Sequence, residues 1–167
     1  MQAAYCLMCR TGSEFDVVKI IQRYAPELKV LAPTRVLPEK VAGQWCCRSK
    51  ALLPGYIFIY SDQECLPPLR SMSRHFYKFL NYELGSRQLA GQDKAYADWL
   101  LANQGEIQTS RILATGDQVQ IIDGPLANHC GKIVKLDKHK RRAWIDFDFD
   151  GQKRTISLGA EFVNTIA

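Results

Sequence analysis

Apolar residues in the first hundred positions follow two periods, one typical of strands and one typical of helices. Short apolar runs or alternating patterns predict strands at residues 4–9, 29–32, 52–60 and 76–80. The third of these is the strongest, since Tyr56, Phe58 and Tyr60 alternate with two isoleucines and both faces have side chains to bury.

Apolar side chains at helical spacing predict a helix over residues 15–24, which Pro26 would end. We expect a capping box at its start, with the Thr11 oxygen accepting a backbone hydrogen bond and Glu14 reaching back. A second helix is predicted from Asp93, as its cap, through Asn103. A weaker helix is predicted over residues 63–72, where two adjacent prolines forbid regular backbone pairing at its start.

The order of these elements is typical of a ferredoxin-like α+β sandwich, in which helices pack on an antiparallel sheet. Residues 33–43, with two prolines and a glycine, interrupt the order as a loop or loose hairpin, and residues 44–48 would form its returning arm. The apolar pattern then lapses over residues 104–114, which indicates a linker.

Beyond this linker the pattern predicts strands alone. They are expected at residues 118–122, 131–136, 143–149 and 153–158, and Asp150-Gly151 has the composition of a two-residue hairpin turn. So many short strands in so few residues favour a small all-β barrel with a filled interior. We therefore expect an α+β domain at residues 1–103, a linker at 104–113 and an all-β domain at 114–167.

Composition narrows the class of protein. With 47% hydrophobic and 23% charged residues, the 167-residue chain is expected to fold. No apolar run is long enough to span a membrane and the start lacks the pattern of a signal peptide, so a cytoplasmic protein with reduced cysteines is expected. Cys6 and Cys9 have C-x-x-C spacing, but on one strand they would point to opposite faces. Neither a metal site nor a cofactor is expected.

Net charge is concentrated in one segment. The whole chain carries 22 basic and 17 acidic residues, a net charge of +5, and residues 127–142 alone carry six basic residues and one acid. Cations beside an aromatic ring suit RNA or single-stranded DNA. The candidate nucleic-acid residues here are Lys132, Lys138, His139, Lys140, Arg141, Arg142 and Trp144. The alternatives are a solvated basic turn and a tryptophan packed against the linker or first domain.

No set of residues in the sequence has the spacing of a catalytic or phosphate-binding site, so a binding protein is expected rather than an enzyme. Leu53, Tyr56 and Phe58 would form either core or, if partly exposed, an apolar socket for a partner helix. Scattered cations on the first predicted helix and its preceding loop, and around the helix predicted at residues 63–72, form a weaker candidate nucleic-acid surface: Arg10, Lys19, Arg23, Arg70 and Arg74.

Three stretches, in order along nearly the whole chain, resemble the NusG family of transcription factors. Residues 115–126 and 131–134 resemble its KOW motif, residues 5–14 resemble the opening of its N-terminal (NGN) domain, and residues 52–59 resemble that domain's central motif. The resemblance implies an NGN domain followed by an SH3-like KOW barrel.

In that family the NGN domain docks on the clamp helices of bacterial RNA polymerase and suppresses pausing. The resemblance thus implies that Leu53, Tyr56 and Phe58 form the polymerase socket. In the RfaH relatives this domain also touches the non-template DNA strand, and Arg10 matches a basic position there. The KOW barrel of the family contacts Rho, a ribosomal protein or RNA.

Two departures favour a specialised member. Leu126 follows Gly-Pro where housekeeping factors usually carry an aromatic residue, and the end of the barrel at residues 152–159 also differs. With its dense basic turn the chain is most similar to the LoaP group, operon-specific antiterminators that recognise a leader RNA hairpin, and it is expected to be a monomer. Alternatives are a general elongation factor and a ribosome-associated KOW protein that binds RNA.

Overall fold

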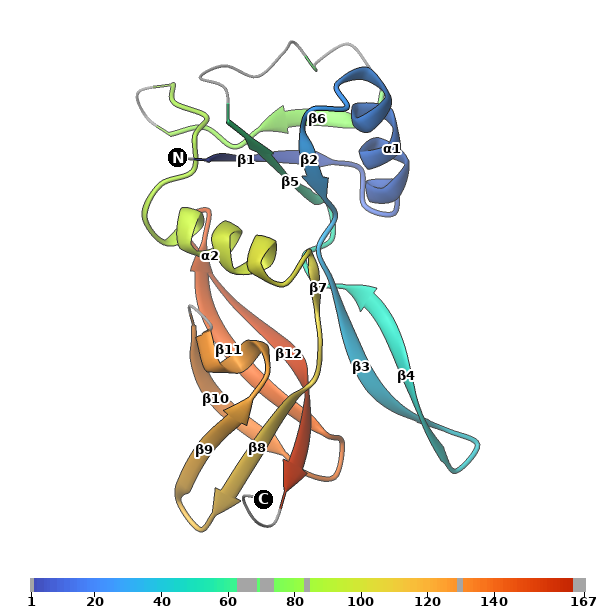
Figure 1. Ribbon diagram of the computed structural model, residues 1–167, viewed down its shortest axis with the longest axis vertical. Helices are drawn as coiled ribbons and strands as arrows, with labels where there is room; N and C mark the ends of the chain where they lie inside the picture. The colour runs from blue at the N-terminus through green and yellow to red at the C-terminus, as the bar shows by residue number, and fades with distance from the viewer. Residues whose placement is uncertain (1, 63–68, 70–73, 83–84, 129–130, 164–167) are drawn as a thin grey trace.

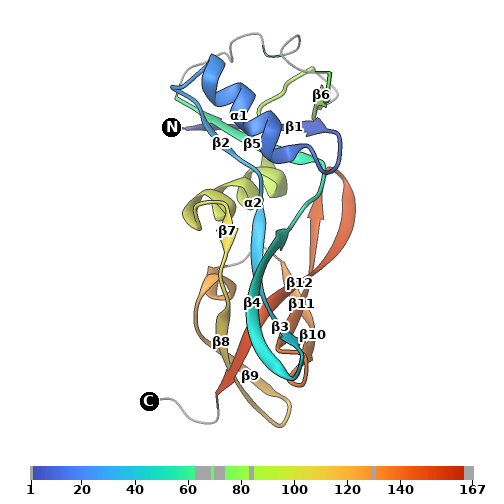
Figure 2. The same cartoon turned by 90° about the vertical axis from the view of Figure 1, so that its right-hand side faces the viewer.

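The computed structural model describes residues 2–62, 69, 74–82, 85–128 and 131–163 (Figure 1). An α/β part is formed by the described residues up to 102, including helix α2 (Gly91–Ala102), and a second, all-β part by the C-terminal third. A long hairpin leaves the α/β part and runs alongside the all-β part in both views (Figures 1 and 2). None of the helices in the described ranges has both the length and the apolar character to cross a membrane.

An antiparallel sheet forms the centre of the α/β part. Its strands, in the spatial order β2-β5-β1-β6, are β2 (Lys29–Leu31), β5 (Tyr56–Ser61), β1 (Ala3–Cys9) and β6 (Phe76–Phe79). All four predicted strands are confirmed. The third begins only at Tyr56, because a turn at residues 52–55 precedes it and Gly55 takes a φ of +85° there.

Two helices cover opposite faces of this sheet: α1 (Glu14–Tyr24) and α2 (Gly91–Ala102). Val17 and Ile21 of α1 pack with Leu7 and Ile57 on one face. Tyr96, Ala97 and Leu100 of α2 pack with Cys6 and Phe58 on the other. The helix predicted at residues 63–72 lies almost wholly outside the described residues.

Both predicted helix caps are wrong in detail. Ser13 stands at the N-cap of α1 with no side-chain hydrogen bond, while Glu14 does reach back to the Gly12 N–H at 2.9 Å. Ala90 is the N-cap of α2, and Asp93 lies inside its first turn. The Asp93 carboxylate instead accepts hydrogen bonds from the Tyr82 hydroxyl and the Asp150 N–H. At α2, long-range partners thus occupy the carboxylate that sequence spacing assigns to a local cap.

The segment expected as a loose hairpin is a regular one. Strands β3 (Thr34–Val41) and β4 (Gln44–Ala51) pair in continuous register, with a turn at Ala42-Gly43 in which both residues have positive φ. Every residue of β4 is exposed, so its sequence carries no alternating apolar signal. On its other side β3 pairs in parallel with the short strand β7 (Glu106–Ile107).

A five-stranded sheet, in the order β10-β11-β12-β8-β9, forms the all-β part. Its elements are β8 (Ser110–Thr115), β9 (Gln118–Asp123), the 3-10 turn η1 (Pro125–Asn128), β10 (Lys132–Asp137), β11 (Arg142–Phe149) and β12 (Gln152–Val163). The predicted Asp150-Gly151 turn is confirmed, with positive φ at both residues. Within the described ranges β9 and β10 are not paired, so closure into a barrel stays a prediction.

Residues 104–113, expected as a linker, are structured. They contain β7 and the first part of β8, and both Ile107 and Ile112 are buried. Each of these strands pairs in parallel with a strand far away in sequence, β3 and β12 respectively. The loss of apolar periodicity therefore marks short strands stabilised by long-range pairing.

One hydrophobic core runs through both parts, with α2 between the two sheets (Figure 1). The Tyr96 ring of α2 stacks on Phe147 of β11, with centroids 4.6 Å apart and planes 12° from parallel. Trp99 donates from Nε1 to the Pro125 carbonyl at 3.0 Å. Burying each such aromatic side chain contributes roughly 1.5–3 kcal/mol, so the contact between the parts stabilises the fold substantially.

Candidate functional site

The three residues predicted to form a socket lie at the junction between the two parts. Leu53 and Phe58 are buried and Tyr56 is half-buried. The Phe58 ring lies 5.9 Å from Tyr96 and 5.5 Å from Phe149, centroid to centroid. In this arrangement Leu53 and Phe58 are therefore core residues, because the C-terminal sheet covers the face of β5 on which Phe58 lies.

Tyr56 is held from the C-terminal side by two residues. Phe149 meets its ring edge-on, at 5.7 Å and 82°. Arg154 Nη2 donates to the Tyr56 hydroxyl at 3.0 Å, and its guanidinium carbon lies 5.2 Å from the ring centroid. A partner that uses this surface has to displace both Phe149 and Arg154. Neither contact could be read from the sequence, since 98 positions separate Arg154 from Tyr56.

A polar contact closes the same junction at the start of α2. The Asp93 carboxylate accepts from the Tyr82 hydroxyl at 2.8 Å and from the Asp150 N–H, in the β11–β12 turn, at 3.0 Å. Burial, together with the nearby carboxylate, raises the pKa of Tyr82 to about 12. Burial also raises the pKa of the Cys6 thiol, and the charges of Asp150 and Asp93 act in the same direction.

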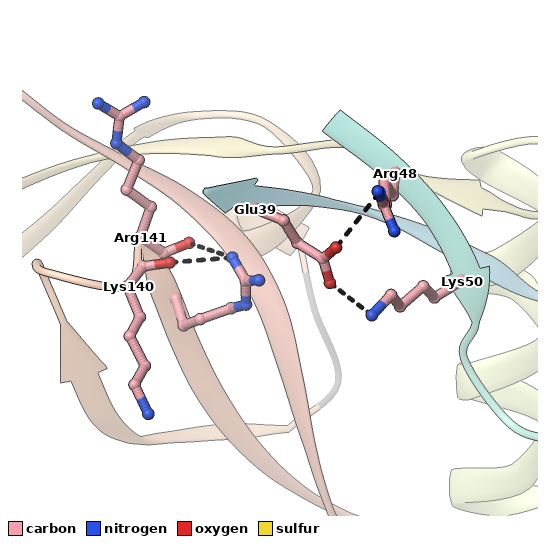
Figure 3. A network of polar contacts seen from close by, with 6 residues as sticks. Glu39, Arg48, Lys50, Lys140 and Arg141 are labelled. Carbon is pink, nitrogen blue, oxygen red and sulfur yellow. Dashed lines mark hydrogen bonds and ion pairs between the residues drawn. The ribbon is translucent and has the colours of Figure 1, made fainter. Parts of the chain in front are cut away.

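The basic turn joins β10 to β11 and exposes four of the predicted nucleic-acid residues: Lys138, His139, Lys140 and Arg141. Its backbone is fixed by a hydrogen bond from the Lys140 N–H to Asp137 Oδ1 at 2.9 Å. The side chains of Lys140 and Arg141 leave the turn in opposite directions (Figure 3). The turn therefore presents cations to both of its sides.

Arg142 has a different place from the one expected. It is half-buried, and its Nη1 donates to the carbonyls of Lys140 and Arg141 at 3.0 and 3.2 Å. Burial lowers the pKa of this guanidinium. Arg142 thus stabilises the turn, because its guanidinium donates hydrogen bonds to backbone carbonyls of the turn.

Trp144 does not stand free beside the turn. It is half-buried, and its indole Nε1 is fully buried with no hydrogen-bond partner among the described residues. Of the two expectations for Trp144, packing within the protein therefore fits its burial better than stacking on a nucleic-acid base. Lys132 is exposed, but it is the first residue of β10. It pairs with Asp146, at the far end of the strand from the turn.

An aromatic ring beside the cations is supplied instead by the hairpin. The guanidinium carbon of Arg141 lies 3.9 Å from the centroid of the Trp45 ring, a close cation–π contact. Between the hairpin and the C-terminal sheet lies a cavity of about 610 Å³, which we name the hairpin groove. It is lined by Pro38, Trp45, Cys46, Cys47, Thr109, Lys138, Arg141, Ala160, Glu161 and Phe162. Sequence reasoning missed Trp45, although a tryptophan followed by Arg48 and Lys50 in a returning arm was a usable signal.

The hairpin itself carries further cations. Glu39 of β3 forms ion pairs with Arg48, at 3.5 Å, and with Lys50, both on β4 (Figure 3). A hydrogen bond from Lys50, aided by the charges of Lys50 and Arg48, lowers the pKa of the Glu39 carboxyl. Two cations share one carboxylate, so this cluster is net positive.

The second basic set is only partly brought together. Arg10, Lys19, Arg23 and Arg74 are all exposed. A hydrogen bond from the Arg10 N–H to the His75 carbonyl, at 2.9 Å, places Arg10 beside the segment that carries Arg74. Lys19 and Arg23 lie four residues apart on α1, and Arg70 lies outside the described residues.

The cysteines do not form a metal site in the part of the chain that the structure describes, where no group of three or more potential ligands gathers. Cys6 belongs to the core on the α2 face of the sheet and Cys9 to the core on the α1 face, as their spacing on one strand predicts. Cys46 and Cys47 are exposed on β4.

Comparison with known proteins points to one family. No protein-family profile matches the chain. The transcription termination/antitermination protein NusG of two Helicobacter pylori strains is 20% identical over 164 residues, which span 92% of this chain and 93% of the relative. A solved structure described as "Domain interaction in Thermotoga maritima NusG" matches with a TM-score of 0.52 and 19% identity, over 95% of this chain and 94% of that one. The shared fold and the nearly full-length alignment together support a relationship to NusG.

Proposed function

We propose that this chain is a NusG-like transcription factor that binds RNA polymerase and controls termination or antitermination. The observation that carries the proposal is the likeness to NusG along nearly the whole chain, in sequence and in fold. The factor would act in the cytoplasm as a monomer, by binding alone, with no bond made or broken. The proposal includes an NGN-like domain at residues 1–103 and a KOW-like domain at 114–167.

The surface around Tyr56 is the polymerase-binding surface in this proposal, with Leu53 and Phe58 beneath it. Apolar and aromatic side chains that become accessible together are typical of a groove for a partner helix. Because Phe149 and Arg154 now cover this surface, docking requires the C-terminal sheet to move away. Polymerase binds the open arrangement alone and so shifts the equilibrium toward it.

Nucleic acid would be contacted through the basic turn. Lys138, His139, Lys140 and Arg141 are exposed and concentrated, which suits contacts to phosphates. On this ground we propose a specialised, LoaP-type factor that recognises a leader RNA hairpin. Contacts of Arg10 and Arg74 with the non-template DNA strand form the second part of this hypothesis.

Transcription in vitro across a terminator tests the proposal, with and without the native leader upstream. Read-through that rises with the factor and depends on the leader supports a specialised antiterminator, whereas read-through without the leader indicates a general elongation factor. Unchanged read-through together with no polymerase binding overturns the proposal. Co-sedimentation with ribosomes would then favour the ribosome-associated alternative.

A further inference from the structure

We propose that the hairpin groove binds a short segment of single-stranded nucleic acid, with one unpaired base against Trp45 and the adjacent phosphates at Lys138 and Arg141. The inference rests on the proposed nucleic-acid role of the basic turn and deepens it. It names the aromatic partner of the turn, the strandedness of the ligand and the arrangement of the protein in which binding occurs.

The groove has the size and the chemistry for such a ligand. A volume of about 610 Å³ lies within the range of sites that hold drug-sized ligands, and a single nucleotide is of that size. Of the described residues that line it, Lys138 and Arg141 are cationic and Glu161 is acidic. His139 and Lys140 follow in the same turn and add positive potential at the rim.

Trp45 makes the site selective for unpaired bases. Its side chain is partly accessible, with 37% of the residue surface exposed, and the Arg141 guanidinium already lies at 3.9 Å from the ring centroid. Aromatic rings with neighbouring arginines are the usual platform on which a base of a single strand stacks. A base inside a duplex is already stacked on both sides, so a duplex can offer the groove only its phosphates.

The cationic wall is held in place before any ligand arrives. Arg141 has a φ of +56°, an uncommon conformation for a side chain of this size, and its carbonyl accepts from the Ala160 N–H at 3.0 Å. Arg142 and Asp137 secure the rest of the turn through hydrogen bonds to its backbone. Binding therefore restricts the backbone of the turn little further, which favours affinity.

The two walls of the groove come from opposite sides of the junction. Trp45 belongs to the hairpin, which extends from the α/β part, and Lys138 and Arg141 belong to the C-terminal sheet. The hairpin and this sheet approach closely: a Cβ placed on Gly159 of β12 would lie 2.8 Å from the Val36 carbonyl oxygen of β3. Movement of the C-terminal sheet away from Tyr56 therefore separates the two walls.

Occupancy of the groove and exposure of the Tyr56 surface therefore oppose each other. A ligand that contacts both walls favours the closed arrangement, in which Tyr56 is covered. Nucleic acid in the groove therefore weakens polymerase binding at Tyr56. By linkage, polymerase binding at Tyr56 must weaken nucleic-acid binding in the groove by the same factor.

Fluorescence anisotropy with labelled oligonucleotides of about eight nucleotides tests the site, using unstructured RNA, the matching DNA and a duplex. We expect the single strands to bind the full-length protein more tightly than the duplex, and Trp45→Ala to weaken them about tenfold or more. Changing Lys138 and Arg141 to Gln should reduce the slope of log affinity against log salt by roughly 0.7 for each phosphate that is no longer neutralised. Tighter binding of RNA assigns the ligand to a transcript, and tighter binding of DNA assigns it to a displaced DNA strand.

Lys153→Gln is the matched control, since it removes an exposed cation of the C-terminal sheet that does not line the groove. Trp45→Phe should restore part of the affinity, and thermal unfolding of each variant checks folding. If Trp45→Ala binds oligonucleotides like the wild type while the Lys138/Arg141 variant binds them more weakly, the proposed groove site is wrong and the basic turn binds nucleic acid without Trp45. Equal affinity for duplex and single strand also overturns the groove site. Polymerase binding of the wild type separates this inference from the proposed function. If the protein binds polymerase but no oligonucleotide, this inference fails and the proposed function stands. If it binds oligonucleotide but no polymerase, the polymerase part of the proposed function fails and this inference stands.

Discussion

Arg154, in the last long strand, donates a hydrogen bond to the hydroxyl of Tyr56, 98 residues earlier in the chain, at 3.0 Å. The guanidinium also lies over the Tyr56 ring and within 5.8 Å of the Phe149 ring. One side chain of the C-terminal sheet thus contacts both the proposed polymerase surface and the aromatic residue that covers it. Weakening this contact should therefore make the surface easier to uncover.

Replacing Arg154 with Ala should loosen the junction. The Tyr56 hydroxyl loses its hydrogen bond from Arg154, which costs about 0.5–1.5 kcal/mol in the free energy of unfolding. Urea denaturation measures this change. Lys153→Ala is the control: its side chain is 73% exposed and its ion pair with Asp146 spans 3.4 Å, so a change within about 0.5 kcal/mol is expected. Equal effects of the two substitutions would contradict the assigned role of Arg154.

Phe147→Ala should destabilise the whole chain, because its ring stacks on Tyr96 in the core shared by both parts. We expect the free energy of unfolding to fall by about 3–5 kcal/mol. The thermal transition should remain single, since one core joins the two sheets. The control Phe15→Ala removes a ring that is 59% exposed, and about 0.5 kcal/mol or less is expected. Two separate transitions in the wild type would show that the parts unfold independently.

The Asp93 carboxylate at the junction is open to a similar test. In Asp93→Ala the Tyr82 hydroxyl and the Asp150 N–H both lose their acceptor, and a destabilisation of about 1–3 kcal/mol is expected in urea denaturation. Asp98→Ala removes an exposed carboxylate from the same helix, where it pairs with Lys94 four residues away, and should be nearly neutral. If Asp93→Ala leaves the free energy of unfolding unchanged, the carboxylate does not stabilise the junction, and water serves as the acceptor in its place.

Thiol reactivity gives a pH-dependent prediction. Burial, with the Glu14 charge, raises the pKa of Cys9 to about 11, and burial raises that of Cys6 as well. A raised pKa leaves fewer reactive thiolates at a given pH, so both residues should react slowly with a disulfide reagent near pH 8. Cys46 and Cys47 are exposed, and the variant with both replaced by Ala should lose a fast phase worth two thiols. An unchanged fast phase would contradict their exposure.

Sequence patterns predicted the elements whose signal is local. Alternation around Tyr56 and Phe58, helical spacing after Phe15, and the Asp150-Gly151 turn each depend on neighbours in the chain, and the structure confirms them. The returning arm predicted at residues 44–48 is confirmed as part of β4, but its full length and regular pairing were not predicted, because every residue of β4 is exposed and the strand has no apolar period.

Features that depend on long-range contacts could not be predicted. Ile107 and Ile112 stand in a polar stretch and are buried only because β7 and β8 pair with distant strands. Asp93 suits a local cap, yet Tyr82 and Asp150 occupy its carboxylate. Of the candidate site, the cations of the basic turn follow from charge clustering alone. Its aromatic partner does not, because Trp144 is adjacent in sequence whereas Trp45 is adjacent in space.

The central claim is that the surface around Tyr56 binds polymerase and that the C-terminal sheet covers it. The most direct test is the Kd for core RNA polymerase of the wild type, Arg154→Ala, and Arg154→Ala combined with Tyr56→Ala. Arg154→Ala should bind about two- to tenfold more tightly, since the covering contact is weakened. The double variant should then bind roughly thirtyfold more weakly than Arg154→Ala. A double variant that binds as tightly as Arg154→Ala alone would contradict the account.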